Sequence, residues 1–541
     1  MVTGTVYEAF RRSAARYPDH DFLCVMPETA ARYGIEAQTF SYERASREVT
    51  GLAERYRQAG LGHGQRTGLM LDNQPDMFFH WLALNSIGAA VVPINSDWRA
   101  AELEYVIGHS EMVAAVVAPK RRQDISDAAR SAGREVAVAS PSLLDLVRVT
   151  APQRGDSFPD STSECALLYT SGTTGQPKGC VLTNEYYIWA GTWYAGLDGL
   201  CRLEEGTERL LTPLPMTHMN AMAFSTMAMV LTGGCVIPLD RFHPTTWWES
   251  VALSRATVIH YLGVMPAMLL GAPESRTDRA HSVRFGFGAG VSPRLHATFE
   301  GRFGFPLIEA WAMTETGAGA VVIANREPRK VGSACFGKPT ARIELRIVTQ
   351  DGSEAAPGQH GELWVRSASD RPEYGFFREY LKDPDATAEA WKDGYFHTGD
   401  IVFADADGDL HFVDRKRNVI RRSGENISAV EVEGVILQHW ATGAVGVAAV
   451  PDEVRGDEVM ACIVLRNPVR EDELRALARE LVDFCLARLA YFKAPGYVTF
   501  CNQLPLTATA KIQRAKLGEL ARQALEQGRA IDLRALKKRA S

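Results

Sequence analysis

The sequence lacks any apolar run of the roughly 20 residues that a membrane-spanning helix needs. Its longest apolar stretches, such as residues 221–231, are far shorter, so we expect no transmembrane span. The first 20 residues also lack the apolar segment of a secretory signal. Arg11 and Arg12 stand there in an amphipathic pattern that predicts a surface helix.

Metal-binding cysteine patterns and an excess of positive charge are missing as well. The nine cysteines form no Cys-x-x-Cys pair and no cluster with histidine, which argues against a structural zinc site and favours reduced thiols in the cytoplasm. With 59 basic and 65 acidic residues the formal net charge is −6. No overall basic field therefore attracts nucleic acid or an acidic membrane, and any polyanion must be bound locally.

The length of 541 residues exceeds what one core usually supports, so two or more domains are expected. Between about residues 60 and 270, short apolar runs such as residues 66–71 alternate with longer helical patterns. This rhythm predicts an α/β fold in which parallel sheets are covered by helices on both faces.

The pattern changes after about residue 330. Residues 343–366 read as two strands joined by a Gly/Pro turn segment, which indicates a small β unit. Beyond residue 430 the sequence predicts a compact α+β module. A charge run follows Asp414, and we therefore expect a large N-terminal domain, 1–414, and a small mobile domain, 415–541.

The segment that points to chemistry is SGTTGQPK, residues 171–178. Glycine lets the backbone approach an anion closely, and hydroxyl groups with a lysine can complete a phosphate cradle. A Walker loop needs Ser or Thr after its lysine, but Gly179 follows Lys178 here. Considered alone, such a loop could equally be a hairpin or a linker.

The longer string YTSGTTGQPKG, residues 169–179, closely resembles the signature of the acyl-adenylate-forming superfamily of acyl-CoA synthetases, peptide-synthetase adenylation domains and luciferases. Further segments resemble that superfamily's motifs in the expected order, so the resemblance covers nearly the whole chain. These segments are residues 213–222, 287–293, 311–317, 395–400, 412–433 and 505–514. The sequence around residues 395–433 is most similar to the carnitine or crotonobetaine CoA ligase branch of the superfamily.

The resemblance implies that a carboxylic acid reacts with ATP to give acyl-AMP and pyrophosphate, and that CoA then displaces AMP. Two anions must meet in the first step, so positive charge is required, and Lys511 is the residue we expect to supply it. Glu315 is the expected Mg²⁺ ligand, because a hard cation prefers carboxylate oxygen. Thr314 would donate to the α-phosphate, and His218 would lie between the acyl pocket and the thiol channel.

The remaining site residues implied by the resemblance fall into three groups. For ATP or AMP they are Thr170, Ser171, Gly172, Thr173, Thr174, Lys178, Gly288, Ala289, Gly290, Trp311, Ala312, Met313, Asp400 and Arg415. Ser423, Gly424 and Glu425 are expected along the CoA arm, with Arg417 at the hinge. The acyl pocket is expected to include Met216, Met219, Met222, Leu262, Gly263 and Val264.

Without the motif context, each of these residues has an ordinary structural explanation. Lys511 would be a solvated lysine, Asp400 the end of a turn, and His218 a satisfied core histidine. The cation-rich residues 415–422 would usually form a solvated face, although here they could also flex at the hinge and meet CoA phosphates.

Three positions depart from the usual superfamily pattern. Trp311-Ala312 replaces the common Tyr-Gly, Thr217 replaces an aromatic residue before His218, and Arg417 replaces Asp or Lys. The first departure leaves open a ligase that makes adenylate poorly and mainly joins a preformed acyl-adenylate to CoA. The sequence also leaves open an enzyme that loads a carrier protein, and a catalytically inert scaffold protein that keeps the fold.

The expected pocket residues are apolar and include adaptable methionines, which favours a medium or bulky apolar or aryl carboxylic acid. A quaternary-ammonium acid would instead require an aromatic box or a carboxylate, for which Trp193, Tyr194 and Asp198 are nearby in the sequence. A homodimer is the default expectation for the assembly.

Overall fold

Two compact units make up the chain. The computed structural model describes residues 4–146, 148–150, 158–170, 176–349, 351–415, 420–423, 425–427, 429–505, 512 and 514–538. The first unit comprises Met1–Ser96, Ile107–Leu168 and Gly179–Val413. The second comprises Asp97–Val106, Tyr169–Lys178 and Asp414–Ser541.

The first sheet lies in the first unit and is mostly parallel. Its order is β14 (Val322–Ile323), β13 (Leu307–Trp311), β12 (Phe285–Ala289), β11 (Val258–Leu262), β9 (Arg209–Thr212), β10 (Cys235–Pro238), β1 (Asp21–Cys24) and β2 (Thr39–Ser41). All neighbours from β13 to β1 pair in parallel, whereas the edge strands β14 and β2 are antiparallel.

The second sheet has the parallel strands expected from the apolar runs between residues 66 and 170. Its order is β18 (Glu379–Tyr380), β8 (Lys178–Thr183), β7 (Glu164–Thr170), β4 (Ala90–Pro93), β3 (Arg66–Met70), β5 (Ala114–Val117) and β6 (Ala137–Ala139). β3, β4 and β5 are buried along their whole length. Burial on both faces is why these strands read as continuous apolar runs rather than alternating ones.

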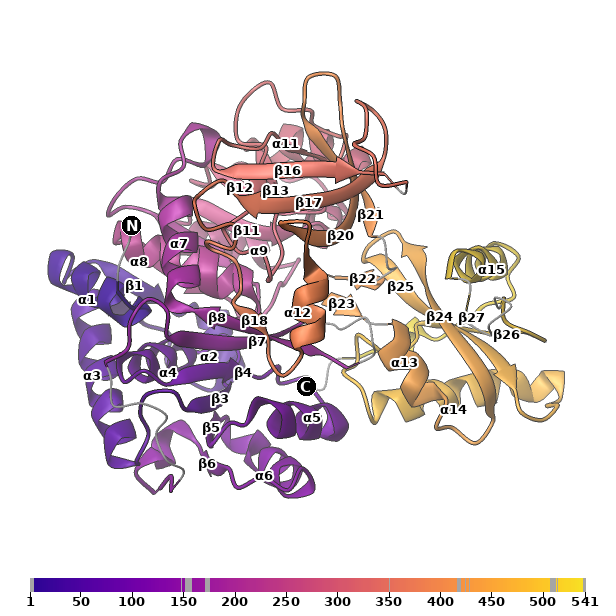
Figure 1. Ribbon diagram of the computed structural model, residues 1–541, viewed down its shortest axis with the longest axis horizontal. Helices are drawn as coiled ribbons and strands as arrows, with labels where there is room; N and C mark the ends of the chain where they lie inside the picture. The colour runs from indigo at the N-terminus through magenta and orange to yellow at the C-terminus, as the bar shows by residue number, and fades with distance from the viewer. Residues whose placement is uncertain are drawn as a thin grey trace. The chain divides into compact units, whose positions relative to one another are not determined.

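Helices cover these two sheets (Figure 1). They are α1 (Val6–Arg16), α2 (Pro27–Tyr33), α3 (Tyr42–Gln58), α4 (Pro75–Ser86), α5 (Ala100–Ser110), α6 (Arg122–Ser131), α7 (Asn184–Ala195), α8 (Met227–Thr232), α9 (Trp247–Ser254), α10 (Val264–Leu270) and α11 (Pro293–Phe303). α1 is amphipathic, as predicted, and packs against α3, α4, α7 and α8. Thr5 and Glu8 form a capping box that starts it.

A third, antiparallel sheet completes the first unit and is the predicted small β unit. Its order is β15 (Cys335–Gly337), β21 (Leu410–Arg415), β20 (Tyr395–Ala404), β17 (Gly361–Ser367) and β16 (Ile343–Val348), with β19 (Trp391–Lys392) also paired to β20 and α12 (Pro384–Ala390) nearby in sequence. The antiparallel pairing of β16 with β17 confirms the hairpin predicted for residues 343–366.

The part of the second unit that follows Asp414 has the α+β composition expected beyond residue 430. Its elements are β22 (Ile420–Arg422), β23 (Glu425–Ile427), α13 (Ala429–Ile436), β24 (Thr442–Asp452), β25 (Gly456–Leu465), α14 (Leu474–Leu486), β26 (Tyr497–Phe500), α15 (Arg514–Glu526) and β27 (Ile531–Asp532). α13 and α15 both pack on β24. Arg422 is buried and its Nε lies 2.7 Å from Glu458 Oε2, so this member of the cation-rich run is used internally.

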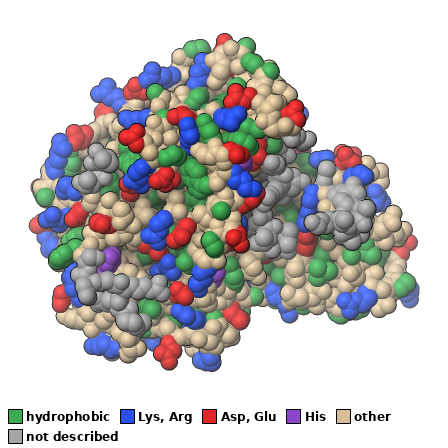
Figure 2. Space-filling model, in the orientation of Figure 1, with side chains coloured by type: hydrophobic (Ala, Val, Ile, Leu, Met, Phe, Trp, Pro, Cys, Tyr) green, Lys and Arg blue, Asp and Glu red, His purple; other side chains and the backbone are tan. Residues whose placement is uncertain are grey.

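The surface charges and the helix lengths are those expected from the net charge and from the short apolar runs. Basic and acidic side chains are interspersed over the face shown in Figure 2, as expected for a chain of small net charge. Among the described residues, no helix has the length and apolar character needed to cross a membrane.

Arg66 and Glu164 link β3 to β7 through two parallel hydrogen bonds, Nε–Oε1 at 2.7 Å and Nη2–Oε2 at 2.8 Å. Both side chains are largely buried. Replacing Glu164 by Gln removes the negative charge that this carboxylate places against the guanidinium, and we expect the free energy of unfolding to fall by about 3 kcal/mol. Urea denaturation followed by circular dichroism measures this loss.

Glu344→Gln is the matched control. It breaks the pair of Glu344 with Arg366, which is more exposed, and should change stability by less than about 1 kcal/mol. Equal stability of the Glu164→Gln variant and the unmodified protein would contradict the importance of the buried pair.

Candidate active site

Four loops with predicted site residues start at one edge of the first sheet. β9, β11, β12 and β13 pair in parallel, so their carboxyl ends share this edge. The loops that leave these ends carry His218, Gly263, Gly290 and Thr314, respectively. Ligands of α/β sheets usually bind outside the carboxyl ends of the strands.

The loop after β12 lies against the loop after β11, and glycine is required there. Gly263 N donates to Ala289 O at 3.0 Å. A Cβ atom on Gly263 would lie 1.7 Å from the carbonyl oxygen of Gly290, so no side chain fits at this position. The predicted residues Gly263, Ala289 and Gly290 are thus brought together.

Glu309 on β13 holds this loop in place, a role that was not predicted from the sequence. Its carboxylate accepts hydrogen bonds from Gly290 N at 2.9 Å, Val291 N at 3.1 Å and the Tyr261 hydroxyl at 2.6 Å. Burial raises the pKa of Glu309, against the lowering effect of these hydrogen bonds. The side chain therefore fixes the loop rather than facing solvent.

Trp311 and Asp400 meet although they lie on different sheets. The Trp311 indole Nε1 donates to Asp400 Oδ2 at 2.9 Å, and only 6% of Trp311 and 1% of Asp400 are exposed. Asp400 N also donates to Thr398 Oγ1 at 3.0 Å. The N–H group of Trp311 thus positions the carboxylate that we expect to contact ribose.

Three hydrogen bonds fix the adjoining Thr314-Glu315 segment. The Tyr186 hydroxyl donates to Thr314 O at 2.8 Å, Phe377 N donates to Glu315 O at 2.8 Å, and the Tyr380 hydroxyl donates to Glu315 Oε1 at 2.9 Å. No described residue donates to Glu315 Oε2. A preorganised carboxylate with an oxygen to spare fits the role of a Mg²⁺ ligand.

Asn73 holds the segment before His218. Its side-chain nitrogen donates to the carbonyl oxygens of Leu214 and Leu239 at 3.0 and 2.7 Å, and its oxygen accepts from Met216 N at 2.9 Å. Asn73 is 2% exposed, so all three bonds are made in the protein interior. No sequence signal distinguished it.

The residues expected in the acyl pocket are divided between two apolar clusters. Met216, Met219 and Met222 belong to the main core, and Leu262 packs against it. Val264 instead packs against a second cluster, around Met265 and Leu269. The three methionines therefore share a cluster with Leu262 but not with Val264.

A buried polar network lies beside Met219. His260 Nδ1 is 2.7 Å from Asn220 Oδ1 and 2.8 Å from Ser225 Oγ, and its Nε2 is 3.0 Å from the Tyr194 hydroxyl. Burial lowers the pKa of His260 to about 3, so the ring is neutral at physiological pH. The sequence signal that could have identified this network is a histidine within the apolar strand of residues 258–262.

Several predicted site residues are described only in part or not at all. Thr170 ends β7 and Lys178 begins β8, while Ser423 has a positive φ of 51° and precedes β23, where Glu425 lies. Arg415 ends β21, but its side chain is outside the description. Outside the described residues are Ser171, Gly172, Thr173, Thr174, Arg417, Gly424 and Lys511, and their roles stay predictions.

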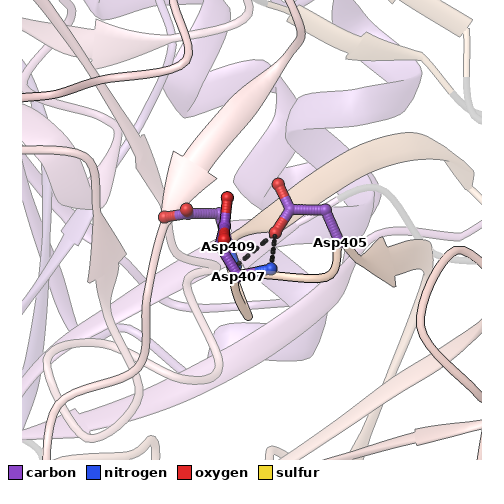
Figure 3. Close-up of side chains that lie close together, drawn as sticks. All are labelled: Asp405, Asp407 and Asp409. Atoms are coloured by element: carbon purple, nitrogen blue, oxygen red, sulfur yellow. Dashed lines mark hydrogen bonds between the residues drawn. The ribbon is translucent and has the colours of Figure 1, made fainter.

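One acidic cluster in the described part of the chain has the spacing of a metal site, and a lysine occupies its centre. Asp405, Asp407 and Asp409 lie together on the turn between β20 and β21 (Figure 3). Lys330 Nζ lies 2.5, 2.6 and 3.2 Å from their respective carboxylates, and His411 Nε2 is 2.9 Å from Asp405. The Lys330 ammonium supplies the positive charge that a metal ion would otherwise bring to these carboxylates. We therefore interpret the cluster as structural.

Comparison with known proteins identifies two family models along the chain. The model described as "AMP-binding enzyme" matches residues 10–381, and that described as "AMP-binding enzyme C-terminal domain" matches residues 431–511. The first match alone covers more than half of the 541 residues. Together they agree with the resemblance found in the sequence motifs.

Curated relatives span almost the whole chain. A sulfoacetate–CoA ligase of Cupriavidus necator is 31% identical over 93% of this chain and 95% of its own length. A crotonobetaine/carnitine–CoA ligase of Salmonella arizonae is 30% identical over 89% of this chain and 93% of its own.

Among solved structures, o-succinylbenzoate CoA synthetase of Bacillus subtilis has a TM-score of 0.79 and 23% identity, with 96% and 99% of the two chains covered. A malonyl-CoA ligase has a TM-score of 0.72 and 25% identity, with 90% and 97% covered. These structures confirm the predicted fold class.

The Trp311–Asp400 hydrogen bond predicts a defect in nucleotide binding when the indole N–H is removed. In Trp311→Phe the buried Asp400 carboxylate loses a donor, and we expect the KM for ATP to rise about tenfold, with a smaller change in kcat. ATP-pyrophosphate exchange at varied ATP concentration measures both constants.

Trp440→Phe is the control for this variant. It removes a Trp–carboxylate hydrogen bond of the same length, to Glu480, from an exposed indole, and should leave the KM unchanged. An unaltered KM in Trp311→Phe would show that Asp400 does not need the indole.

The lysine-centred aspartate cluster predicts a pH-dependent loss of stability in Lys330→Met. Burial acts to raise the pKa of Asp405, but hydrogen bonds from Lys330 and His411 outweigh it and hold the pKa below the ordinary 3.8. A lowered folded-state pKa stabilises the fold above 3.8 and loses this contribution as the pH falls through the folded value.

We therefore expect the Tm of Lys330→Met to fall most above about pH 5, and the difference from the unmodified protein to shrink below about pH 4. Lys338→Met is the control, because Lys338 is more exposed and lies 3.8 Å from Asp409. A Tm difference that did not vary with pH would refute the electrostatic explanation.

Proposed function

The chain belongs to the AMP-binding enzyme family, and on that basis we propose that it is an ATP-dependent acyl-CoA ligase. It activates a carboxylic acid as acyl-AMP, releasing pyrophosphate, and the CoA thiol then attacks the acyl carbonyl and displaces AMP. The curated relatives are named as CoA ligases, and the malonyl-CoA ligase structure holds methylmalonyl-CoA and AMP.

The observation that carries the proposal is the arrangement at the edge of the first sheet. Trp311 ends β13, Thr314 and Glu315 follow it in the next loop, and Trp311 Nε1 donates to the Asp400 carboxylate. A carboxylate suits two ribose hydroxyls because it accepts hydrogen bonds only. Glu315 would hold Mg²⁺, which neutralises phosphate charge when bound.

Positive charge at the reacting groups is the second requirement. We assign Lys178 and the residues 170–174 to the β- and γ-phosphates and Lys511 to the α-phosphate and the substrate carboxylate. A mobile ammonium suits charge that develops between two anions. His218 follows the segment that Asn73 fixes, and we assign it to a position between the acyl pocket and the thiol channel.

For the second half-reaction we propose that the domain 415–541 moves relative to 1–414 about Arg417. Ser423, Gly424 and Glu425 then lie along the CoA arm, and Arg415 contacts the ribose. Arg422 is not assigned to CoA, because Glu458 already binds it.

The substrate we propose is an apolar or aryl carboxylic acid. Met216, Met219 and Met222, packed with Leu262, support an adaptable apolar wall, while the neutral His260 network provides no fixed charge. We place the enzyme in the cytoplasm, because all nine cysteines are free thiols, and propose a homodimer as the default assembly.

A ligase with weak adenylation was suggested by the departure at Trp311-Ala312. The hydrogen bond from Trp311 fixes the Asp400 carboxylate that we assign to ribose, which supports full adenylation.

Lys511→Ala tests the assignment. We expect ATP-pyrophosphate exchange, measured with a panel of aliphatic, aryl and polycyclic acids, to fall on the order of 10²- to 10³-fold. Lys516→Ala, on the exposed surface of α15, should exchange at the unmodified rate.

Unchanged exchange in Lys511→Ala would remove that residue from the mechanism. If the unmodified protein exchanges with no acid but converts a supplied acyl-adenylate and CoA to thioester, it is a ligase with weak adenylation. If neither reaction occurs, it is an inert scaffold.

A further inference from the structure

A cavity of about 400 Å³ opens between α7 and the third sheet, apart from the predicted site residues. All of its lining belongs to the first unit. The side chains that give it its chemical character are Trp189, Trp193, Tyr374, Arg342, Thr340 and Ser369. Its volume is within the range of small-molecule sites, which are mostly apolar with a few placed polar groups.

Aromatic rings form one wall of the cavity. The rings of Trp189 and Tyr374 are 5.1 Å apart and inclined at 60°. Trp189 Nε1 already donates to Ala318 O at 3.0 Å, so its polar edge is satisfied. Trp193 is buried and packs against Phe224, at 5.5 Å between ring centroids. Trp189 therefore offers its ring face rather than its N–H group.

Arg342 gives the cavity an uncompensated positive charge. Its guanidinium carbon lies 5.4 Å from the centroid of the Trp189 ring. Among the described residues, none makes a side-chain hydrogen bond or an ion pair with this guanidinium. A guanidinium over a ring keeps its N–H edge free for a bidentate anion.

The neighbouring Arg371 shows the contrast. It lies 5.4 Å from the Tyr374 ring centroid, but its two Nη atoms donate to Glu185 at 3.0 and 2.8 Å. Arg371 is thus neutralised, and Arg342 is the cation left to meet a ligand. Asp370 and Glu373, on the loop before Tyr374, are exposed and do not line the cavity.

We propose that this cavity binds a small aromatic anion of the aryl carboxylate or aryl sulfonate class. The ring packs against Trp189 and Tyr374, the anionic group pairs with Arg342, and the hydroxyls of Thr340 and Ser369 lie at the rim. A quaternary ammonium ligand, which an aromatic wall alone would suit, is repelled by Arg342.

The cavity lining includes a short segment that follows the proposed Mg²⁺ ligand in sequence. Ala318 and Gly319 line it and lie three and four residues after Glu315. Gly319 N donates to Gly375 O at 3.2 Å, close to the Phe377 N–H that holds Glu315 O. A ligand in the cavity would therefore contact the backbone that carries the predicted Mg²⁺ ligand.

The test is a calorimetric titration of naphthalene-2-sulfonate into the full chain without ATP or CoA. We expect saturable binding that weakens as salt is added, because Arg342 is exposed. Arg342→Gln should weaken it about tenfold or more, since a charge-assisted pair is lost. Trp189→Leu should also weaken it, and the neutral probe 2-naphthol should bind less tightly than the sulfonate.

Arg346→Gln is the matched control. Arg346 lies on β16, 5.8 Å from the Trp364 ring centroid, and pairs with Glu354 at 2.8 Å, so its loss should leave binding unchanged. Absence of binding at millimolar probe, equal affinity in Arg342→Gln, or preference for benzyltrimethylammonium would each overturn the proposal. Because neither ATP nor CoA is present, these outcomes are independent of the proposed ligase activity.

Discussion

The hydrogen bond from Trp311 to Asp400 ties the edge of the first sheet to the third sheet. A buried carboxylate is costly unless hydrogen bonds compensate for the water it has lost. The Asp400 carboxylate accepts a hydrogen bond from the Trp311 indole, and the Asp400 backbone N–H donates to the Thr398 hydroxyl. Because separating the two sheets would remove the hydrogen bond from Trp311 to Asp400, the position of β20 and the start of the loop after β13 depend on each other.

Many charges in the rest of the protein are paired with a charge of opposite sign. The largely buried Arg66, Arg329 and Arg422 each bind a glutamate, and the partly exposed Lys330 is surrounded by three aspartates. A chain of net charge −6 that joins anionic reactants therefore cannot rely on a general positive field. Binding of ATP, CoA and a carboxylate has to come from a few cations and backbone N–H groups placed at the site, which is what the glycine-rich loop and Lys511 are proposed to provide.

Local sequence patterns predicted much of the fold because they report on local physics. Continuous apolar runs between about residues 60 and 270, such as residues 66–71, predicted strands such as β3, and the turn segment within residues 343–366 predicted the β16–β17 hairpin. The motif segments indicated loops that we expect to carry site residues, and the parallel pairing of β9, β11, β12 and β13 explains why four of these loops start at the same edge of the sheet.

The residues that hold these loops could not be predicted in the same way. Asn73 binds backbone groups 141 to 166 positions away, and Trp311 and Asp400 are separated by 89 positions. Glu309 and His260 lie within apolar strands, where their partners are set by tertiary packing rather than by neighbours in sequence. Partner choice for a buried polar group is a property of the assembled fold.

Trp311, which departs from the superfamily pattern, is an example of a buried polar group whose partner is explained by the fold. Its N–H edge donates to Asp400, and one neighbour of its ring is Phe336, 6.3 Å away between centroids. A tyrosine or phenylalanine at position 311 has no indole N–H with which to reach this carboxylate. The substitution therefore adds a contact between the two sheets, so a larger side chain at this position is an argument for an organised nucleotide site rather than against one.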